Sequence, residues 1–210
     1  DIRKDMESES PMNRLIQGDV GSGKTIVALI AMLICIDNGF QAVMMAPTEI
    51  LADQHFKNIN NLLGNFNINI SLLLGSQNKR ERKSVLEEIE SGSAQIIIGT
   101  HALIQEAVNF NKLGLVVIDE QHRFGVHQRL SLRNKGTSGS LRPHQLMMTA
   151  TPIPRTLAMS AYADLDCSVI DELPPGRTPI TTVVISDQRR PEIIERVRLG
   201  CEEGRQAYWV

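Results

Sequence analysis

The sequence predicts an α/β fold, a three-layer α/β/α sandwich with a mostly parallel central sheet. Near-continuous apolar runs, such as AQIIIGT at residues 94–100 and LGLVVID at residues 113–119, are typical of strands buried on both faces. These runs alternate with longer amphipathic stretches, which indicates β-α-β crossovers with helices on both sides of the sheet. A glycine-rich stretch, QGDVGSGKT at residues 17–25, separates the first apolar run from the first helical pattern.

Each predicted element follows from its local pattern. The helix over residues 24–37 is apolar on a broad face and stops at Asn38-Gly39, a common C-terminal signal. The next helix is expected to begin after Thr48, a good N-cap residue, and to carry a stripe that includes His55 and Ile59. Further helices are expected over residues 79–90 and 154–163. The expected strands are residues 14–17, 41–46, 68–74, 95–99, 114–119, 145–149 and 167–170.

The proline-rich stretch Pro174-Pro175-Gly176 breaks this rhythm, because it suits neither a helix nor a central strand. We therefore expect one domain over residues 1–173, followed over residues 174–210 by a linker and the truncated start of a second lobe. Beyond the boundary we expect a strand at residues 180–185, a helix at 191–203 and a further strand beginning at residue 207. The chain begins without methionine and ends in an apolar run, so we expect a fragment of a longer protein.

Composition sets limits on the class of protein. The 210 residues carry a net charge of −2, which does not by itself indicate a nucleic-acid partner. No apolar run approaches the roughly 20 residues that cross a bilayer, so we expect no membrane partner. The three cysteines, Cys35, Cys167 and Cys201, are widely spaced, and we expect them to be reduced core thiols in a cytoplasmic protein.

The glycine-rich stretch matches the phosphate-loop pattern G-x-x-x-x-G-K-[ST] and stands between a predicted strand and a predicted helix. Glycines let backbone N–H groups turn toward an anion, and the helix N-terminus adds partial positive charge. Lys24 is expected to hold the β- and γ-phosphates of ATP, and Thr25 to bind Mg²⁺. The alternative is a glycine-rich turn with a chance Lys-Thr pair. The expected nucleotide-binding residues are Gly18, Asp19, Val20, Gly21, Ser22, Gly23, Lys24 and Thr25.

Two adjacent carboxylates, Asp119 and Glu120, follow the apolar run at residues 115–118. Ligands of open parallel sheets collect at the carboxyl ends of the strands. Asp119 is therefore expected to hold Mg²⁺, and Glu120 to orient or deprotonate an attacking water. The alternative is a strand that ends in solvated acids. Together with the phosphate loop, the pair predicts catalysis of ATP hydrolysis by Lys24, Asp119 and Glu120.

The order of these motifs resembles the first motor lobe of the superfamily 2 helicases, which has a RecA-like fold. The resemblance covers nearly the whole chain, and in detail the sequence is most similar to the RecG-type family of branched-DNA translocases. The transcription–repair coupling translocases share RFGV and TATPIPRTL, but Gln121 and the DELPPGR stretch favour the RecG type. The strings that carry the resemblance are MNRLIQGDVGSGKT, APTEILADQHF, GTHALI, VVIDEQHRFGVHQR, MTATPIPRTLAM and IDELPPGRTPI.

The resemblance implies an ATP-dependent DNA helicase that acts on stalled forks and Holliday junctions in repair and recombination. Its partners would be branched duplex DNA, a second RecA-like lobe that supplies an arginine, and a wedge domain. From the residues alone, capping of helices by Thr48 and Thr100 is the simpler interpretation. The residues implied to face DNA are Thr48, Glu49, Gly99, Thr100 and His101. The residues implied to couple nucleotide state to DNA grip are Gln121, His122, Thr149 and Thr151.

Two functions of other classes fit parts of the pattern. A small-molecule P-loop kinase would use the phosphate loop, but it would leave TATPIPRT without a role. A catalytically silent module that binds nucleotide as a switch would not need Glu120.

Overall fold

The computed structural model describes residues 1–120, 124, 131–132, 134–136, 142–151, 165–172 and 181–209. The chain forms two compact units, Asp1–Pro174 and Pro175–Val210, and each unit is described by itself. None of the helices in the described ranges is long and apolar enough to cross a membrane.

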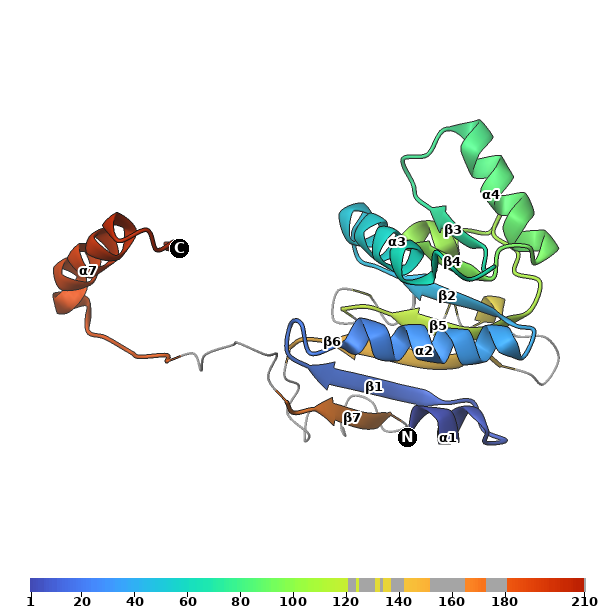
Figure 1. Cartoon of the computed structure of the whole chain (residues 1–210), viewed down its shortest axis with the longest axis horizontal. Coiled ribbons are helices and arrows are strands. Elements are labelled where there is room, and N and C mark those ends of the chain that lie inside the picture. Colours follow the sequence, from blue (N-terminus) through green and yellow to red (C-terminus); the bar gives the residue numbers. More distant parts are fainter. Residues whose placement is uncertain are drawn as a thin grey trace. The chain divides into compact units, whose positions relative to one another are not determined.

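The first unit is built on a seven-stranded sheet with the strand order β3-β4-β2-β5-β6-β1-β7 (Figure 1). All of its strand pairs are parallel. The predicted α/β class is therefore confirmed, and the sheet is fully parallel over the described residues. The strands are β1 (Asn13–Gly18), β2 (Gln41–Met45), β3 (Ile70–Leu73), β4 (Ile96–Gly99), β5 (Leu113–Ile118), β6 (His144–Thr149) and β7 (Asp166–Ile170).

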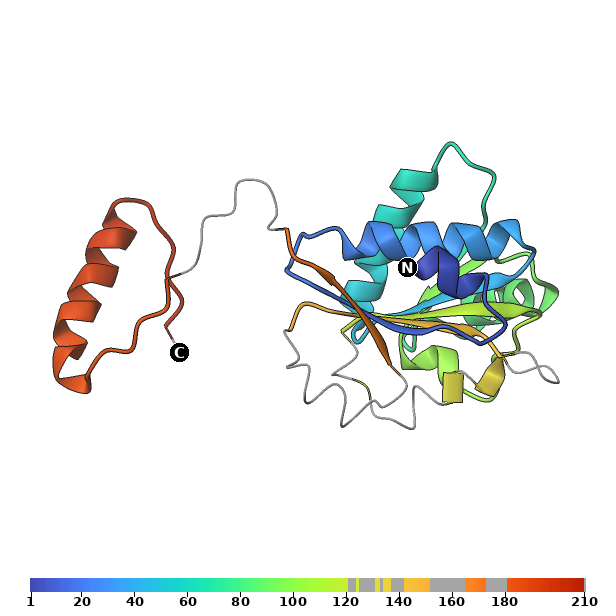
Figure 2. The same ribbon diagram turned by 90° about the horizontal axis from the view of Figure 1, so that it is seen from below.

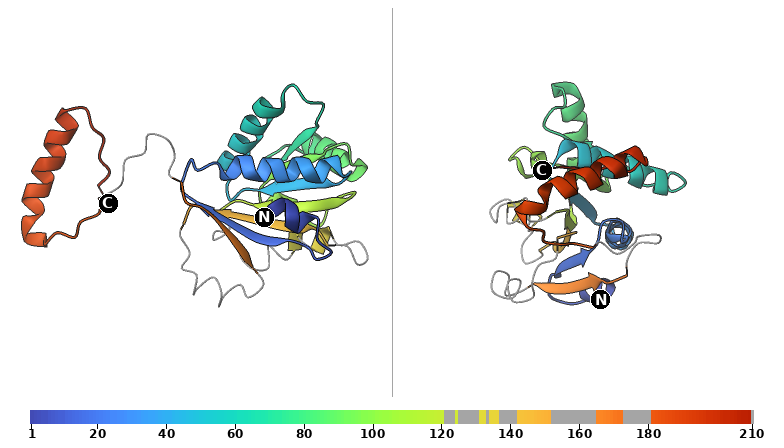
Figure 3. Two further views of the ribbon diagram at one scale, coloured as in Figure 1. Left: turned by 60° about the horizontal axis from the view of Figure 1, so that its bottom comes forward. Right: turned by 90° about the vertical axis from the view of Figure 1, so that its left-hand side faces the viewer.

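Helices cover both faces of this sheet, so this unit has the three predicted layers. One core contains side chains from α2 and α3, and the other contains side chains from α4 and the short 3-10 helix η1. Figure 2 shows α2 running along one face of the strands, and the right-hand view of Figure 3 looks along its axis. The helices are α1 (Ile2–Met6), α2 (Lys24–Asp37), α3 (Glu49–Leu63), α4 (Lys79–Ser91) and η1 (His101–Ile104).

Side-chain alternation along the strands explains the two cores. In β2, Ala42 and Met44 belong to the core under α2 and α3, whereas Val43 and Met45 belong to the other core. All four are fully buried. The continuous apolar runs of the sequence thus mark strands that are covered on both sides, as predicted.

The predicted strands of this unit are all present, and their ends lie within two residues of the prediction. Thr48 caps α3 by accepting a hydrogen bond from the Leu51 N–H at 3.3 Å. Helix α1 was not predicted because its stretch is mostly polar, yet Ile2 and Met6 pack against the core. The predicted helix at residues 154–163 and the Pro174-Pro175-Gly176 stretch lie outside the described residues.

The second unit contains the 3-10 helix η3 (Asp187–Arg189) and the helix α7 (Arg190–Glu202), close to the predicted helix. The strands expected at residues 180–185 and from 207 are wrong over the described residues, because 181–186 and 205–209 form no strand. A strand needs a neighbouring strand for its backbone hydrogen bonds. The described part of this unit provides none.

The cysteine prediction is partly wrong. Cys35 is buried, and burial raises the pKa of its thiol to about 12, so it is an inert core thiol. Cys167 and Cys201 are exposed. Cys167 lies on the edge strand β7, and Cys201 lies on α7, a helix with no buried residue.

Gln41 at the start of β2 is a buried amide, 4% exposed, whose hydrogen-bonding capacity is fully used. Its Nε2 donates to the carbonyls of Ile89 at 3.0 Å and Ala94 at 2.8 Å. Its Oε1 accepts from the N–H groups of Asn111 at 2.8 Å and Lys112 at 3.2 Å. The side chain thus connects β2 to the end of α4 and to the chain entering β5.

We expect Gln41→Ala to lower the free energy of unfolding by about 2–4 kcal/mol, because four hydrogen bonds to backbone groups are lost and two of them are buried. Gln41→Glu should also destabilise the fold, since a carboxylate cannot donate to the two carbonyls. Urea unfolding checks both values, with the exposed Gln54→Ala on α3 as a control that should stay within about 0.5 kcal/mol of the wild type. A loss below about 0.5 kcal/mol in Gln41→Ala would contradict the assigned role.

Candidate nucleotide-binding site

The phosphate loop connects β1 to α2 and takes the backbone form that its glycines predict. Gly21 and Gly23 have positive φ angles of 82° and 92°. Gly23 is the N-cap of α2, and nothing lies within 4 Å of the position of a Cβ there, so the constraint is conformational and not steric. The Ser22 N–H donates to the Asp19 carbonyl at 3.1 Å, which closes the turn.

Lys24 is the first residue of α2, and its side chain folds back over the loop. Its Nζ donates to the carbonyl oxygens of Gly18 and Asp19, both at 2.7 Å. Within the described part of the chain, the buried Ser22 hydroxyl has no hydrogen-bond partner. An ammonium group, a spare hydroxyl and a helix N-terminus therefore converge on one turn, which fits a bound phosphate group.

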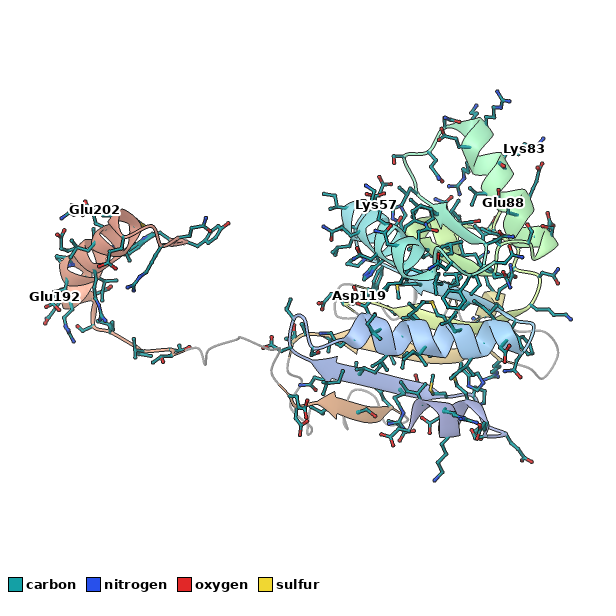
Figure 4. All side chains as sticks on the ribbon, viewed as in Figure 1. Lys57, Lys83, Glu88, Asp119, Glu192 and Glu202 are labelled. Atoms are coloured by element: carbon teal, nitrogen blue, oxygen red, sulfur yellow. The ribbon has the colours of Figure 1, made fainter. Side chains whose placement is uncertain are left out.

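Asp119 follows β5 directly and is held at several atoms. Its N–H donates to the Met45 carbonyl at 2.9 Å, which extends the pairing of β5 with β2. Its Oδ1 accepts from the Glu120 N–H at 3.0 Å, and its Oδ2 contacts His55 Nε2 at 2.8 Å. The side chain is 13% exposed. Figure 4 shows Asp119 at the edge of the sheet where β5 ends.

Glu120 has a φ of 48°, the one positive φ among the described residues other than glycine. Such a conformation is rare for a glutamate and often marks a functional site. Its Oε2 accepts from the Thr149 hydroxyl at 3.4 Å, and the same Thr149 oxygen accepts from the Thr151 N–H at 3.1 Å. Thr149 is fully buried at the end of β6 and thus connects Glu120 to Thr151 in the segment that follows β6.

The phosphate loop and the carboxylate pair lie at the same edge of the sheet. Both begin where a parallel strand ends, and β6 is the one strand between β1 and β5. Leu15 of β1 and Ile118 of β5 are level, because both pair with Met147, and two strand spacings place them about 10 Å apart. A triphosphate with its metal fits such a span, and this arrangement is the one that hydrolysis requires.

The donor set also fits Mg²⁺. The described residues contain no group of three or more histidine, cysteine or acidic side chains that could hold a metal by themselves. Magnesium in nucleotide sites is typically held by one or two carboxylates together with phosphates and waters. Asp119 and the half-buried Thr25 hydroxyl are the oxygen ligands available for that arrangement.

A second group of predicted residues meets at the ends of β2 and β4. The Glu49 carboxylate accepts hydrogen bonds from the Ser76 N–H at 3.0 Å and the Ser76 hydroxyl at 2.7 Å. These bonds lower the pKa of the Glu49 carboxyl group, to which the His101 imidazole adds a smaller contribution. A Cβ on Gly75 would lie 3.4 Å from Glu49 Oε1 and 3.8 Å from His101 Nε2, so the three residues are neighbours.

Two further residues of this group have clear constraints. A Cβ on Gly99 would lie 2.4 Å from the Leu73 carbonyl, so glycine is required where β4 approaches β3. The Thr100 hydroxyl is buried and has no hydrogen-bond partner within the described ranges. Thr100 stands at the N-cap position of η1 without a side-chain cap, so the capping interpretation holds for Thr48 and not for Thr100.

Sequence reasoning missed two site residues. His55 was predicted as part of the apolar stripe of α3, and nothing in its local pattern signalled a contact with Asp119 across 64 positions. Ser76 follows β3, and its contact with Glu49 depends on strand order. Gln121 and His122, predicted to act in coupling, lie outside the described residues.

A cavity of about 640 Å³ lies at the opposite edge of the sheet, beside the end of α2 and the starts of β5 and β6. Its lining includes Arg3, Arg142 and His144 but none of the phosphate-loop residues or carboxylates described above. The candidate nucleotide site is therefore the open edge formed by the strand ends.

The fully parallel sheet and the phosphate loop between its β1 and α2 define a P-loop nucleotide-binding domain of the α/β class. The chain belongs to the DEAD/DEAH box helicase family, whose model matches residues 4–160.

Individual relatives refine this assignment. The chain is 60% identical over its full length to the ATP-dependent DNA helicase RecG of Haemophilus influenzae and to that of Escherichia coli K12. It spans 30% of the length of each of these relatives. A solved structure of RecG bound to a three-way DNA junction superposes with a TM-score of 0.79 at 46% identity, covering 97% of this chain and 27% of that one. The Hef helicase domain of Pyrococcus furiosus shares the fold, with a TM-score of 0.60 at 21% identity. The match covers 81% of this chain and 37% of that one.

Proposed function

We propose that this chain is the first motor lobe of an ATP-dependent DNA helicase that remodels branched DNA such as stalled forks and Holliday junctions. The observation that carries the proposal is the convergence, at one edge of one sheet, of Lys24 in its loop with Asp119 and Glu120. The relatives named RecG support the class of reaction and of DNA substrate.

In the nucleotide site, the loop from Gly18 to Thr25 binds the phosphates through its N–H groups, and Lys24 neutralises the β- and γ-phosphate charge. Asp119 and Thr25 hold Mg²⁺, which supplies charge neutralisation during phosphoryl transfer. Glu120 orients and deprotonates the attacking water. Its hydrogen bond with Thr149 fixes the direction of the carboxylate and connects it to Thr151.

The DNA-facing group forms one patch at the ends of β2 and β4. Its residues are Thr48, Glu49, Gly99, Thr100 and His101. The backbone N–H groups of this patch bind the phosphodiester backbone, a contact that fixes position without reading sequence. Glu49 repels phosphate and instead fixes the loop that carries Ser76. We assign the coupling between this patch and the nucleotide to Gln121, His122, Thr149 and Thr151.

The longer protein would add a second RecA-like lobe and a wedge domain. Residues 1–173 form the first lobe, and residues 174–210 form the linker and the start of the second. The second lobe closes over the nucleotide and supplies an arginine that stabilises the transferred phosphoryl group.

The test is phosphate release by the full-length protein with ATP and Mg²⁺, measured with and without a three-way junction. We expect junction DNA to stimulate hydrolysis at least about tenfold, and more than linear duplex of equal length. The chain of 210 residues alone should hydrolyse ATP about 10³–10⁵-fold more slowly, because the second-lobe arginine is worth that much in related reactions. Brisk DNA-stimulated hydrolysis by this chain alone, or an absence of stimulation in the full-length protein, would contradict the proposal.

A further inference from the structure

His55 occupies an unusual position on α3, because it is a polar residue on the helix face that packs against the sheet. Ala52 and Ile59 on the same stripe are both fully buried, and His55 lies three residues after one and four before the other. The His55 side chain is 12% exposed. An imidazole in such a position is destabilising unless it has a hydrogen-bond partner.

That partner is Asp119, the carboxylate assigned to Mg²⁺. His55 Nε2 lies 2.8 Å from Asp119 Oδ2. An ionised carboxylate only accepts hydrogen bonds, so Nε2 carries the hydrogen. The other oxygen, Oδ1, accepts from the Glu120 N–H at 3.0 Å. One donor on each oxygen fixes the rotation of the carboxylate plane, which sets the direction of the remaining lone pairs.

The same helix also begins in the proposed DNA-facing patch. Thr48 caps α3, and Glu49 in its first turn holds Ser76. The rise from Glu49 to His55 is about 9 Å, short enough for this part of the helix to move as one body. Helix α3 therefore begins at the DNA-facing patch, and His55 on its second turn contacts Asp119, the carboxylate assigned to Mg²⁺.

We propose that His55 is a positioning residue that orients Asp119 for Mg²⁺ and transmits displacement of α3, caused by DNA contact, to the metal site. The inference rests on the proposed function, because it takes Asp119 as the metal ligand and the start of α3 as DNA-facing. In this role His55 acts through Asp119, which it contacts at 2.8 Å, and not directly on nucleotide or DNA.

A matched pair of substitutions separates this role from simple packing. In His55→Gln the amide nitrogen reaches about the position of Nε2, so the hydrogen bond to Asp119 Oδ2 is kept. In His55→Asn the amide is one bond shorter and falls short of Oδ2. Both variants are neutral, polar and smaller than histidine. Asn58→Ala, at an exposed position of the same helix, is the control for general effects of substitution in α3.

The first readout needs no turnover. It is the affinity of the ADP complex of the full-length protein for Mn²⁺, measured by electron paramagnetic resonance. We expect His55→Asn to weaken Mn²⁺ binding about 10–100-fold, the range found for residues that orient metal ligands. His55→Gln and Asn58→Ala should stay within about threefold of the wild type. Equal affinity in His55→Asn and the wild type, or equal loss in His55→Asn and His55→Gln, would overturn the positioning role.

The second readout is the ratio of junction-stimulated to unstimulated ATP hydrolysis at saturating Mg²⁺. His55→Asn should lower this ratio at least about fivefold while His55→Gln keeps it, and an unchanged ratio in His55→Asn would overturn the transmission role.

If His55→Asn fails to fold, the nitrogen-15 chemical shifts of the histidines in the wild type test the inference instead. His55 should shift on adding Mg²⁺ and ADP, and again on adding junction DNA, and a resonance that stays in place overturns the inference. A wild type whose hydrolysis is not stimulated by DNA would instead refute the proposed function itself.

Discussion

Replacing Lys24 with alanine in the full-length protein should reduce the rate of ATP hydrolysis by at least about 10²–10³-fold, the loss expected when one preorganised charge on the transition state is removed. In the structure the Lys24 ammonium group lies inside the curve of the phosphate loop, 2.7 Å from the carbonyls of Gly18 and Asp19. A phosphate bound there replaces those carbonyls as the partner of the ammonium group. Alanine removes this charge together with the two hydrogen bonds to the carbonyls of Gly18 and Asp19.

The measurement is phosphate release under saturating junction DNA, together with the dissociation constant for that DNA. DNA affinity should remain within about twofold of the wild type, because the DNA-facing patch follows β2 and β4 and does not include Lys24. Lys57→Ala is the matched control, since Lys57 is an exposed lysine of α3 that is paired with Asp53 at 2.6 Å (Figure 4). Retained unwinding in Lys24→Ala would refute the role assigned to this lysine.

The parts of this fold that sequence reasoning predicted are those governed by local pattern. A run such as residues 96–98, Ile-Ile-Ile, is typical of a strand buried on both faces, and β4 is such a strand. The predicted helix over residues 24–37 has the same bounds in the structure, because its apolar face and the Asn38-Gly39 signal at its end are local patterns. The strand order was not predicted, because nothing local in β6 requires it to lie between β1 and β5.

The parts of the site that were missed all depend on that strand order. His55 and Asp119 meet because β2 and β5 are neighbours, and Glu49 and Ser76 meet because α3 and the loop after β3 share one edge. Glu120 and Thr149 come together because β5 pairs with β6. Predicting the chemistry of Lys24, Asp119 and Glu120 needs only motifs, whereas predicting what orients them needs the sheet.

The segments predicted to be strands in the second unit show that local pattern alone does not make a strand. Their apolar and β-branched residues favour extended backbone, and Val183 and Val184 are indeed exposed in a stretch without regular structure. Strand propensity describes a fit to a half-buried pleated surface and cannot create one. In the proposed longer protein, a sheet edge of the second lobe would give these segments the strand partner that the described residues of this unit do not provide.

Replacing Glu120 with glutamine should reduce hydrolysis by about 10²–10⁴-fold while leaving nucleotide affinity nearly unchanged. Glutamine has the same length and shape, and its carbonyl oxygen still accepts the hydrogen bond that Thr149 donates to Glu120 Oε2. The backbone φ of 48° is equally unfavourable for both residues, so the substitution adds no new strain. What disappears is the basic oxygen that takes a proton from the attacking water.

Two assays on the full-length protein separate this loss from a loss of binding. Phosphate release should fall, whereas the affinity for a fluorescent ATP analogue should stay within about threefold, so that the variant holds ATP without turnover. Glu106 is an exposed acid that follows η1, and Glu106→Gln is the matched control, which should behave as the wild type. Unchanged phosphate release in Glu120→Gln would mean that the carboxylate takes no part in the reaction. The strained backbone and the contact with Thr149 would then have to serve nucleotide sensing alone, as in a switch that binds ATP without using it.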